Sequence, residues 1–244
     1  MFSQNSMSIL SRKKSFSFED FSAACQNENH PLGEASMRKQ MQSLLKSGVI
    51  VRVGRNAYCL ASSKVSRYQY EYSDQACQIA ETVVENCPLL RFTVFELIQL
   101  NEFVNHQQAH NVFFLSVEED VENFVFDMMK ERYPGKVLID PTPRLYHQYW
   151  YSGMIVINKL VTEAPKGVPV PWHTRLEKML VDLVCDEILM ETISESEYPT
   201  ILEDAFTKYA IDESCLFRYA KRRGAEKRFR NLIRNKTDIE LRTE

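Results

Sequence analysis

Glycine is scarce in this 244-residue sequence, with only seven in the chain, and none stands in a phosphate-binding loop motif. The Gly-x-Ser-x-Gly motif of serine hydrolases is missing. So is the Gly-Ser followed by an Asp-x-Asp pair that nucleotidyl transfer needs. These absences argue against the common nucleophilic and phosphoryl-transfer enzymes. We expect a protein that is not an enzyme and that uses no cofactor.

Long apolar runs are also missing, because no uncharged stretch reaches the ~18 residues that a membrane-spanning helix needs. The first residues lack the apolar core of a secretion signal. Six cysteines are scattered without a Cys-x-x-Cys pair, which favours reduced packing thiols over disulfides or a zinc site. We therefore expect a cytoplasmic protein with no membrane partner.

Two acidic or histidine-containing patterns fall short of known metal chemistry. Glu102, His106 and His110 would share one face if a helix ran through them, but Gln107 stands where a metalloprotease needs glutamate. Asp140 ends an expected strand, as a nuclease acid could. The next strand offers only Asn158 before Lys159, without the second carboxylate that metal-assisted hydrolysis requires. We expect no metal site, and a degenerate nuclease fold is the least favoured function.

Charge is distributed unevenly along the chain. Residues 1–60 carry 8 Lys+Arg against 4 Asp+Glu, whereas the remainder carries 22 against 29. A basic amino-terminal segment followed by an acidic remainder suggests two modules with different partners.

Two helices and a turn are predicted in the first module. Ser17 is an N-cap residue followed by acidic Glu19 and Asp20, so a helix should begin there and end at the turn-forming segment 26–33. A second helix is expected over 34–46. Its apolar positions form one stripe, and Gly48 supplies the left-handed residue that ends it. The stripe contains Met37, Met41, Leu44 and Leu45.

A hairpin should follow, because alternating residues 49–53 and the return 57–60 flank the turn Gly54-Arg55-Asn56. Helix, turn, helix and hairpin is the order of a winged helix-turn-helix. The pattern LxxLxxxGxIxRxGxxxYxL resembles the winged-helix domains of bacterial AbiEi-type antitoxins. Here it is carried by Met41, Leu44, Leu45, Gly48, Ile50, Arg52, Gly54, Tyr58 and Leu60.

The polar face of the second helix is the candidate DNA-binding surface. A helix fits the major groove of double-stranded DNA, and an arginine-bearing wing reaches phosphate or the minor groove. The candidate contacts are Ser36, Arg38, Lys39, Gln42 and Lys46 on the helix, with Arg52 and Arg55 on the wing. A winged helix that contacts only protein, and a simple solvated face, are the alternatives.

The second module reads as mixed α/β with a helical end, which makes the whole fold α+β. We place the winged helix at 1–62, a polar linker at 63–74 and the second domain at 75–244. Within the last, helices are expected over 74–85, 96–103 and 118–132, and strands over 89–95, 111–117, 136–139 and 153–160. Val121, Phe124, Val125 and Met128 should form the buried stripe of the helix 118–132.

From Thr174 onward the sequence is mostly helical. Thr174 and Glu177 are spaced as a capping box, and further helices are expected over 197–209 and 213–233. The last is strongly basic, and Arg222, Arg223, Lys227 and Arg230 would gather on roughly one side as a second nucleic-acid contact. A solvated helix end that favours cations is the alternative.

The segment from Glu177 to Leu183 is similar to a helix in the second domain of AbiEi-type antitoxins. The resemblance implies a type IV toxin–antitoxin system. Its antitoxin would bind operator DNA, repress its own operon and counter a nucleotidyltransferase toxin without a stable complex. The alternative is a winged-helix regulator whose second domain senses a ligand or protein.

Overall fold

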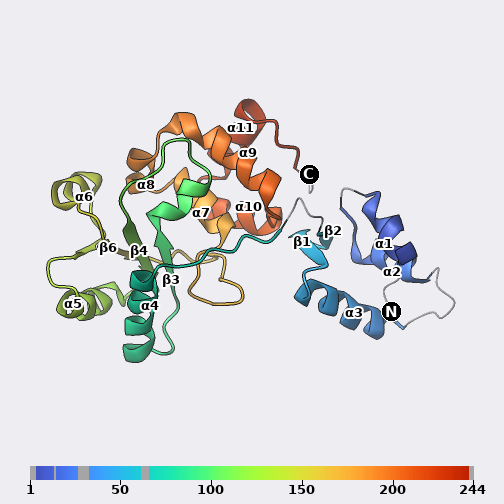
Figure 1. Ribbon diagram of the computed structural model, residues 1–244, viewed down its shortest axis with the longest axis horizontal. Coiled ribbons are helices and arrows are strands. Elements are labelled where there is room, and N and C mark those ends of the chain that lie inside the picture. The colour runs from blue at the N-terminus through green and yellow to red at the C-terminus, as the bar shows by residue number, and fades with distance from the viewer. Residues whose placement is uncertain (1–3, 14, 27–32, 62–65, 242–244) are drawn as a thin grey trace. The chain divides into compact units, whose positions relative to one another are not determined.

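The computed structural model describes residues 4–13, 15–26, 33–61 and 66–241 and has a mixed α+β fold with two small sheets (Figure 1). Its contacts divide the chain into two compact units. The first unit comprises 1–68, 203–217 and 238–244, and the second comprises 69–202 and 218–237. The sequence had placed 203–217 and 238–244 in the second domain. Within the described ranges, no helix combines the length and apolar character needed to cross a bilayer.

The first unit begins with three helices and a hairpin. The elements are α1 (Gln4–Ser11), α2 (Phe18–Gln26), α3 (Glu34–Lys46), β1 (Ile50–Gly54) and β2 (Ala57–Leu60). Helix α1 was not predicted. Residue Phe16, between α1 and α2, pairs antiparallel with Tyr58, exchanging backbone hydrogen bonds of 2.8 and 2.9 Å. The small sheet therefore has a short third segment beside the hairpin.

Local capping explains where these elements begin and end. The Ser17 hydroxyl accepts a hydrogen bond from the Asp20 amide, while the Asp20 carboxylate accepts one from the Ser17 amide. Gly48 has a φ of 72°, the left-handed conformation that glycine adopts without a steric cost. The predicted bounds of α3 and of the second hairpin strand are confirmed, whereas the first strand covers 50–54 instead of 49–53, so Gly54 belongs to β1. Of the predicted turn 26–33, residues 27–32 lie outside the described residues, as do 63–65 of the predicted linker.

The core of the first unit forms where α3 packs against α1, α2 and the hairpin. Met37 and Met41 are buried as the apolar stripe predicted, whereas Leu44 and Leu45 are partly exposed. Burying each such side chain contributes about 1.5–3 kcal/mol. Their partners in this cluster include Leu10, Phe16, Phe21 and Ile50.

The later segment 203–217 adds to the first unit at the hairpin. Ser66 pairs with Tyr209, and the Ala210 amide donates a 2.8 Å hydrogen bond to the Ser66 carbonyl. Ala210 also packs against a small cluster of Val51, Val53 and Cys59. A chain segment about 150 residues further on therefore completes the packing of the hairpin.

The second unit is built on a four-stranded sheet with helices. Its elements are α4 (Asp74–Asn86), β3 (Phe92–Glu96), the 3-10 helix η1 (Leu97–Glu102), β4 (Val112–Val117), α5 (Glu122–Arg132), β5 (Val137–Ile139), α6 (Pro143–Tyr149), β6 (Met154–Lys159), α7 (Leu176–Leu183), α8 (Glu187–Thr192), the 3-10 helix η2 (Glu195–Glu197) and α11 (Glu226–Lys236). Helices α9 (Tyr198–Lys208) and α10 (Glu213–Arg222) have one end in each unit.

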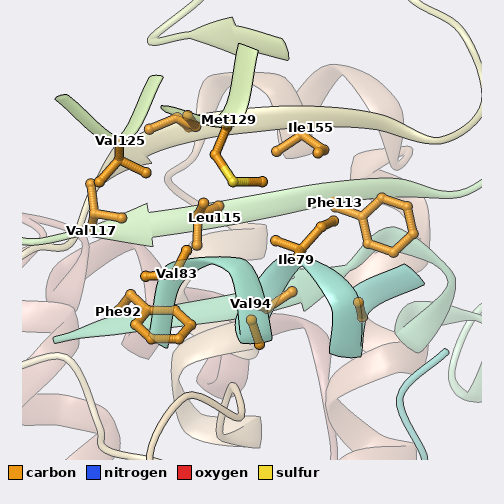
Figure 2. Close-up of a cluster of buried hydrophobic side chains, with 13 residues drawn as sticks. Ile79, Val83, Phe92, Val94, Phe113, Leu115, Val117, Val125, Met129 and Ile155 are labelled. Carbon is orange, nitrogen blue, oxygen red and sulfur yellow. The ribbon is translucent and has the colours of Figure 1, made fainter. Parts of the chain in front are cut away.

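The sheet order is β3-β4-β6-β5, with β3 antiparallel to β4 and the remaining pairs parallel. One face carries α4 and α5, whose apolar side chains meet those of the strands (Figure 2). Ile79 and Val83 of α4 lie toward Val94 and Leu115, and Met129 of α5 lies near Ile155 (Figure 2). Every residue of β3 and β4 is buried, so both faces of the sheet are covered, as is usual around parallel strands.

The outer edge of β3 is also covered. The Val94 amide donates a 2.9 Å hydrogen bond to the Trp172 carbonyl, and the Thr174 hydroxyl donates one of 2.8 Å to the Val94 carbonyl. This pairing satisfies backbone groups that an edge strand would otherwise expose.

Several predictions for the second unit were wrong. Leu89 is 95% exposed, because the strand starts only at Phe92, and Phe124 is 59% exposed, since α5 begins at Glu122 and turns Val125 and Met129 inward. Helix α6 was missed, although Thr142 caps it and Pro143 opens it. Thr174 does not cap α7: Arg175 is at the N-cap, and Glu177 binds Arg175 instead.

The predicted helix over 213–233 is two helices. Gly224 has a φ of 69° and separates α10 from α11. Backbone hydrogen bonds from Gly224 and Ala225 to Lys221 and Ala220 close the end of α10. The basic residues of this region therefore do not share one continuous helical face.

Candidate nucleic-acid interface

The exposed face of α3 carries the predicted contact residues together. Because Met37 and Met41 anchor the opposite face in the core, the helix turns its polar side outward. All five helical candidates are exposed: Ser36, Arg38, Lys39, Gln42 and Lys46. The sequence thus placed these side chains correctly on one solvent-facing helix.

Arg38 is the most constrained residue of this face. Its Nη2 and Nε atoms donate hydrogen bonds of 2.7 and 3.0 Å to Oε1 of Glu34. Its guanidinium also lies 4.7 Å from the centre of the Phe18 ring, within cation–π range. Both partners hold Arg38 toward the first turn of α3 and the start of α2.

Three of the other helical candidates have side chains without a partner among the described residues. Lys39, Gln42 and Lys46 make no side-chain hydrogen bond or ion pair within the described part of the chain. An unpaired cation or amide keeps its donors available for a phosphate or a base edge. These three side chains are therefore better placed than Arg38 to bind without first losing a partner.

The hairpin presents its two arginines differently. Arg55, at the turn, has an exposed side chain, while its backbone amide donates a 2.7 Å hydrogen bond to the Ser214 hydroxyl. The Arg52 Nε atom donates to the Gly54 carbonyl at 3.0 Å and lies 3.7 Å from Oδ2 of Asp212. Arg55 is thus available, whereas Arg52 is partly neutralised.

Asn56 fixes the turn of the hairpin to the start of α2. It has a φ of 53°, its Oδ1 accepts from the Phe18 amide at 3.1 Å, and its Nδ2 donates to Glu19 Oε2 at 2.9 Å. The hydrogen bond from Asn56 lowers the pKa of the Glu19 carboxyl. The hairpin therefore keeps a defined direction relative to α2.

Net charge in the first unit is close to neutral once its later segments are counted. Its 68 amino-terminal residues carry 10 Lys+Arg against 4 Asp+Glu, but the full unit carries 12 against 11. The other acidic residues of the unit lie in segments 203–217 and 238–244. One of them, Asp212, forms an ion pair with Arg52. The excess of positive charge is therefore confined to the 68 amino-terminal residues and does not extend to the unit as a whole.

The predicted second contact surface at the carboxyl end is not assembled. Arg222, on α10, donates a hydrogen bond to the Thr162 hydroxyl, and Arg230, on α11, binds Glu226 at 3.1 Å. Lys227 is exposed on α11. Arg223, largely buried, faces inward to Asp182 at 3.3 Å. The four residues have separate roles because Gly224 breaks the helix between them.

Arg223 belongs to a buried polar network that joins α7, α8 and α10 in the second unit. Asp182 is its centre: it accepts hydrogen bonds from Lys178 at 2.7 Å and from the Tyr219 hydroxyl at 2.8 Å. Burial and the Asp182 charge raise the pKa of Tyr219, so the phenol stays protonated and donates. Burial also raises the pKa of the neighbouring Cys185 thiol, which makes it a poor nucleophile. The sequence had suggested a nucleic-acid contact for Arg223 and had given no sign of this network.

The residues of the possible metal and nuclease sites do not come together in the fold. Helix η1 ends at Glu102, so His106 and His110 do not continue it: His106 binds Glu197 at 2.6 Å, and His110 packs on Trp150. Lys159 binds Glu119 rather than Asp140. Among the described residues, no group of three His, Cys, Asp or Glu side chains is arranged to hold a metal ion.

The chain belongs to the family of unknown function DUF6577, whose match spans residues 36–239. That span begins in α3 and covers the hairpin and the second unit. No curated protein matches the chain. Among solved structures, the crystal structure of RV2827C protein from Mycobacterium tuberculosis is similar over 97% of this chain and 82% of that one. The identity is 12% and the TM-score is 0.25, which is too low to define a shared fold.

Proposed function

We propose that the amino-terminal part of the first unit is a winged helix-turn-helix that binds double-stranded operator DNA. Its order of elements supports this: α1, the Phe16 segment, α2, α3, then the two strands of the hairpin. In such a domain α3 enters the major groove and the hairpin is the wing. The pairing of Phe16 with Tyr58 supports the proposal, because it would be the third strand segment that attaches such a wing to its helices.

The observation that carries the proposal is the exposed polar face of α3 beside the Arg55 turn. Lys39 and Lys46 are suited to phosphates, and Gln42 and Arg38 carry the donors that read adenine and guanine edges. Arg55 would reach a phosphate or the minor groove from the wing. The almost neutral charge of the whole unit means that affinity depends on these few side chains rather than on a general basic field.

We propose further that this DNA binding represses the protein's own operon and that the protein acts in the cytoplasm as a type IV antitoxin against a nucleotidyltransferase toxin. This part rests on the resemblance to AbiEi-type antitoxins in the hairpin pattern and in the segment from Glu177 to Leu183. The proposed protein is a regulator without catalytic activity of its own. A stable complex with the toxin is not required.

The test uses the full-length chain and the DNA immediately upstream of its own reading frame. Gel shift or fluorescence anisotropy should show specific binding that survives excess unrelated duplex, with log affinity falling linearly against log salt. A reporter fused to the same DNA should be repressed by the protein. Equal affinity for unrelated duplex, or no binding at low salt, would contradict the operator-binding proposal.

The antitoxin part has a separate test. If an adjacent gene encodes a nucleotidyltransferase, its expression should arrest growth and co-expression of this protein should restore it. Rescue by a variant that no longer binds the operator would assign neutralisation to the second unit. Failure of rescue with intact operator binding would leave a plain transcriptional regulator.

A further inference from the structure

The second unit contains a cavity of about 260 Å³ that the proposed DNA-binding function does not use. It lies where the end of α4, the start of β3 and the loop after β6 meet. Its volume exceeds the roughly 150 Å³ in which an apolar cavity accommodates benzene. Most of its wall is apolar, from Val84, Pro88, Leu90, Phe92, Leu160, Ala164, Pro165, Pro171 and Trp172.

One polar group in this wall lacks a partner. Thr93, which lines the cavity, is only 3% exposed, and its hydroxyl makes no hydrogen bond with any described residue. Burying a hydroxyl without a hydrogen bond costs free energy, so such groups are rare in folded proteins. The hydroxyl oxygen has less than 1 Å² of accessible surface, so a molecule in the cavity would touch the rest of Thr93 and not this atom.

Two cationic side chains line the same cavity and set the charge it favours. Lys166 is exposed and forms no ion pair in the described ranges of the chain. Arg91 is held only loosely by Glu118, with 3.9 Å between Nε and Oε1. No acidic residue lines the cavity. The electrostatic preference is therefore for an anion.

The loop that forms one wall is fixed in place by its backbone. A Cβ atom at Gly167 would lie 2.2 Å from the Val170 carbonyl oxygen and 2.4 Å from that of His173, so only glycine fits. The loop is also joined to β3 through the hydrogen bond between Val94 and Trp172. A wall held in this way exists before any ligand arrives, which lowers the cost of binding.

We propose that this cavity is a binding site for a small organic carboxylate with an apolar, ring-sized body. The ring lies among the apolar side chains, and Lys166 and Arg91 balance the charge of the carboxylate at the mouth. The inference is independent of DNA binding and stands even if the proposed operator function fails. It assigns the second unit a ligand, whereas α3 and the hairpin are assigned DNA.

Trp172 is a reporter built into the cavity wall. The chain has two tryptophans, so Trp150→Phe leaves Trp172 as the single tryptophan, which is excited selectively at wavelengths that tyrosine does not absorb. The full-length Trp150→Phe protein is titrated with 3-phenylpropionate as the probe, and with 3-phenylpropanamide as its uncharged match. We expect saturable one-to-one binding with a dissociation constant of about 1 mM or tighter. The amide should bind at least about fivefold more weakly, because it lacks the charge.

Two variants separate binding from folding. Arg91→Met removes the second cation at the mouth of the cavity, so it should weaken binding of 3-phenylpropionate about threefold to fivefold and leave binding of 3-phenylpropanamide unchanged. Lys166→Met keeps the apolar part of the side chain and removes its charge. It should weaken binding of 3-phenylpropionate about threefold to fivefold and leave binding of 3-phenylpropanamide unchanged. Lys136→Met, exposed and outside the cavity, is the matched control and should change neither.

Three outcomes would overturn the proposal: no saturable response of Trp172, equal affinity for acid and amide, or unchanged affinity in both cavity variants. A fluorescence change that depends on protein concentration but not on the probe would assign the surface to a second copy of the chain instead. Because each readout comes from Trp172 and none from DNA, these results are distinguishable from failure of the operator proposal.

Discussion

The guanidinium of Arg38 lies 2.7 Å from Oε1 of Glu34, one helical turn earlier on the same exposed face of α3. Both side chains are about two-thirds exposed, so the pair is screened and contributes little to stability. In the proposed DNA interface the pair matters for recognition, because the carboxylate would repel DNA phosphates and occupy the Arg38 donors that would bind a base.

Glu34→Gln should therefore strengthen operator binding. We expect about a threefold gain in affinity at low salt that shrinks as salt rises, because the repulsion is screened. Anisotropy titrations at several salt concentrations measure it. Glu85→Gln, an exposed acid of α4 in the second unit, removes the same charge and should leave affinity unchanged. A loss of affinity in Glu34→Gln would mean that the pair positions Arg38 productively.

Lys39 and Arg55 offer the sharpest test of the proposed interface, because no described residue pairs with either side chain. The double variant Lys39→Ala with Arg55→Ala should reduce the slope of log affinity against log salt by about 2, roughly 1 for each phosphate contact. The matched variant Arg132→Ala with Lys136→Ala removes two exposed cations from the second unit. Equal slopes for the two double variants would remove α3 and the hairpin from the DNA interface.

Arg223 should behave as a structural residue despite its place in a basic sequence. Arg223→Met leaves the buried Asp182 with less compensation, and we expect a loss of about 3 kcal/mol in the free energy of unfolding. Lys227→Ala, on exposed α11, should change stability by less than about 0.5 kcal/mol. Urea unfolding compares the two. A stable Arg223→Met protein with weakened DNA binding would restore the second contact surface.

Glu197 should make folding sensitive to acid. Its hydrogen bond with His106, 2.6 Å long, lowers the pKa of this carboxyl below its ordinary value of 4.5. A group with a lowered folded-state pKa contributes stability above its unfolded pKa and loses it as pH falls through the folded value. At pH values below about 4.5, the urea concentration at the unfolding midpoint should therefore decrease. Glu197→Gln should make this decrease smaller.

The control for the loss of stability at low pH is Glu187→Gln, which removes an exposed acid at the start of α8. It should leave the pH dependence of the urea midpoint as in the parent protein. If Glu197→Gln keeps the full acid decline, the hydrogen bond with His106 does not persist in solution.

Gly167 should be intolerant of any side chain. Gly167→Ala places a methyl group against two backbone oxygens that cannot rotate away, and we expect about 3 kcal/mol of destabilisation with a shift in Trp172 emission. In Gly135→Ala the added methyl group contacts no neighbouring atom. The only loss of stability comes from the left-handed φ of 73°, about 1–2 kcal/mol. Equal costs at the two positions would show that the loop relaxes.

Local interactions made much of the first unit readable from sequence. Ser17 and Asp20 are three residues apart and cap each other, and Met37 and Met41 are one turn apart on a single helical face. Gly48 and Asn56 tolerate positive φ at the two turns. Each signal acts between residues that are neighbours in the chain, so no knowledge of the rest of the fold is needed to interpret it.

The wrong predictions arose where a distant partner competed with a local one. Thr174 is spaced to cap α7, yet its hydroxyl binds the Val94 carbonyl, 80 residues away, because that carbonyl lies on a sheet edge that must be satisfied. The basic run at the carboxyl end resembled one face, but Gly224 divides it and Asp182 draws Arg223 inward. Spacing alone cannot rank such competing partners.

The sequence by itself determined α3, its exposed polar face and the hairpin, because helix periodicity and turn residues are properties of short segments. Only the tertiary structure decided that the acidic segment 203–217 packs with the hairpin, and that Asp212 meets Arg52 there. It also brought apolar residues from α4, β3 and the loop after β6 together around a cavity. The physical reason is that burial and charge pairing depend on groups from distant parts of the chain. The spacing of residues in the sequence does not indicate which of these groups come into contact.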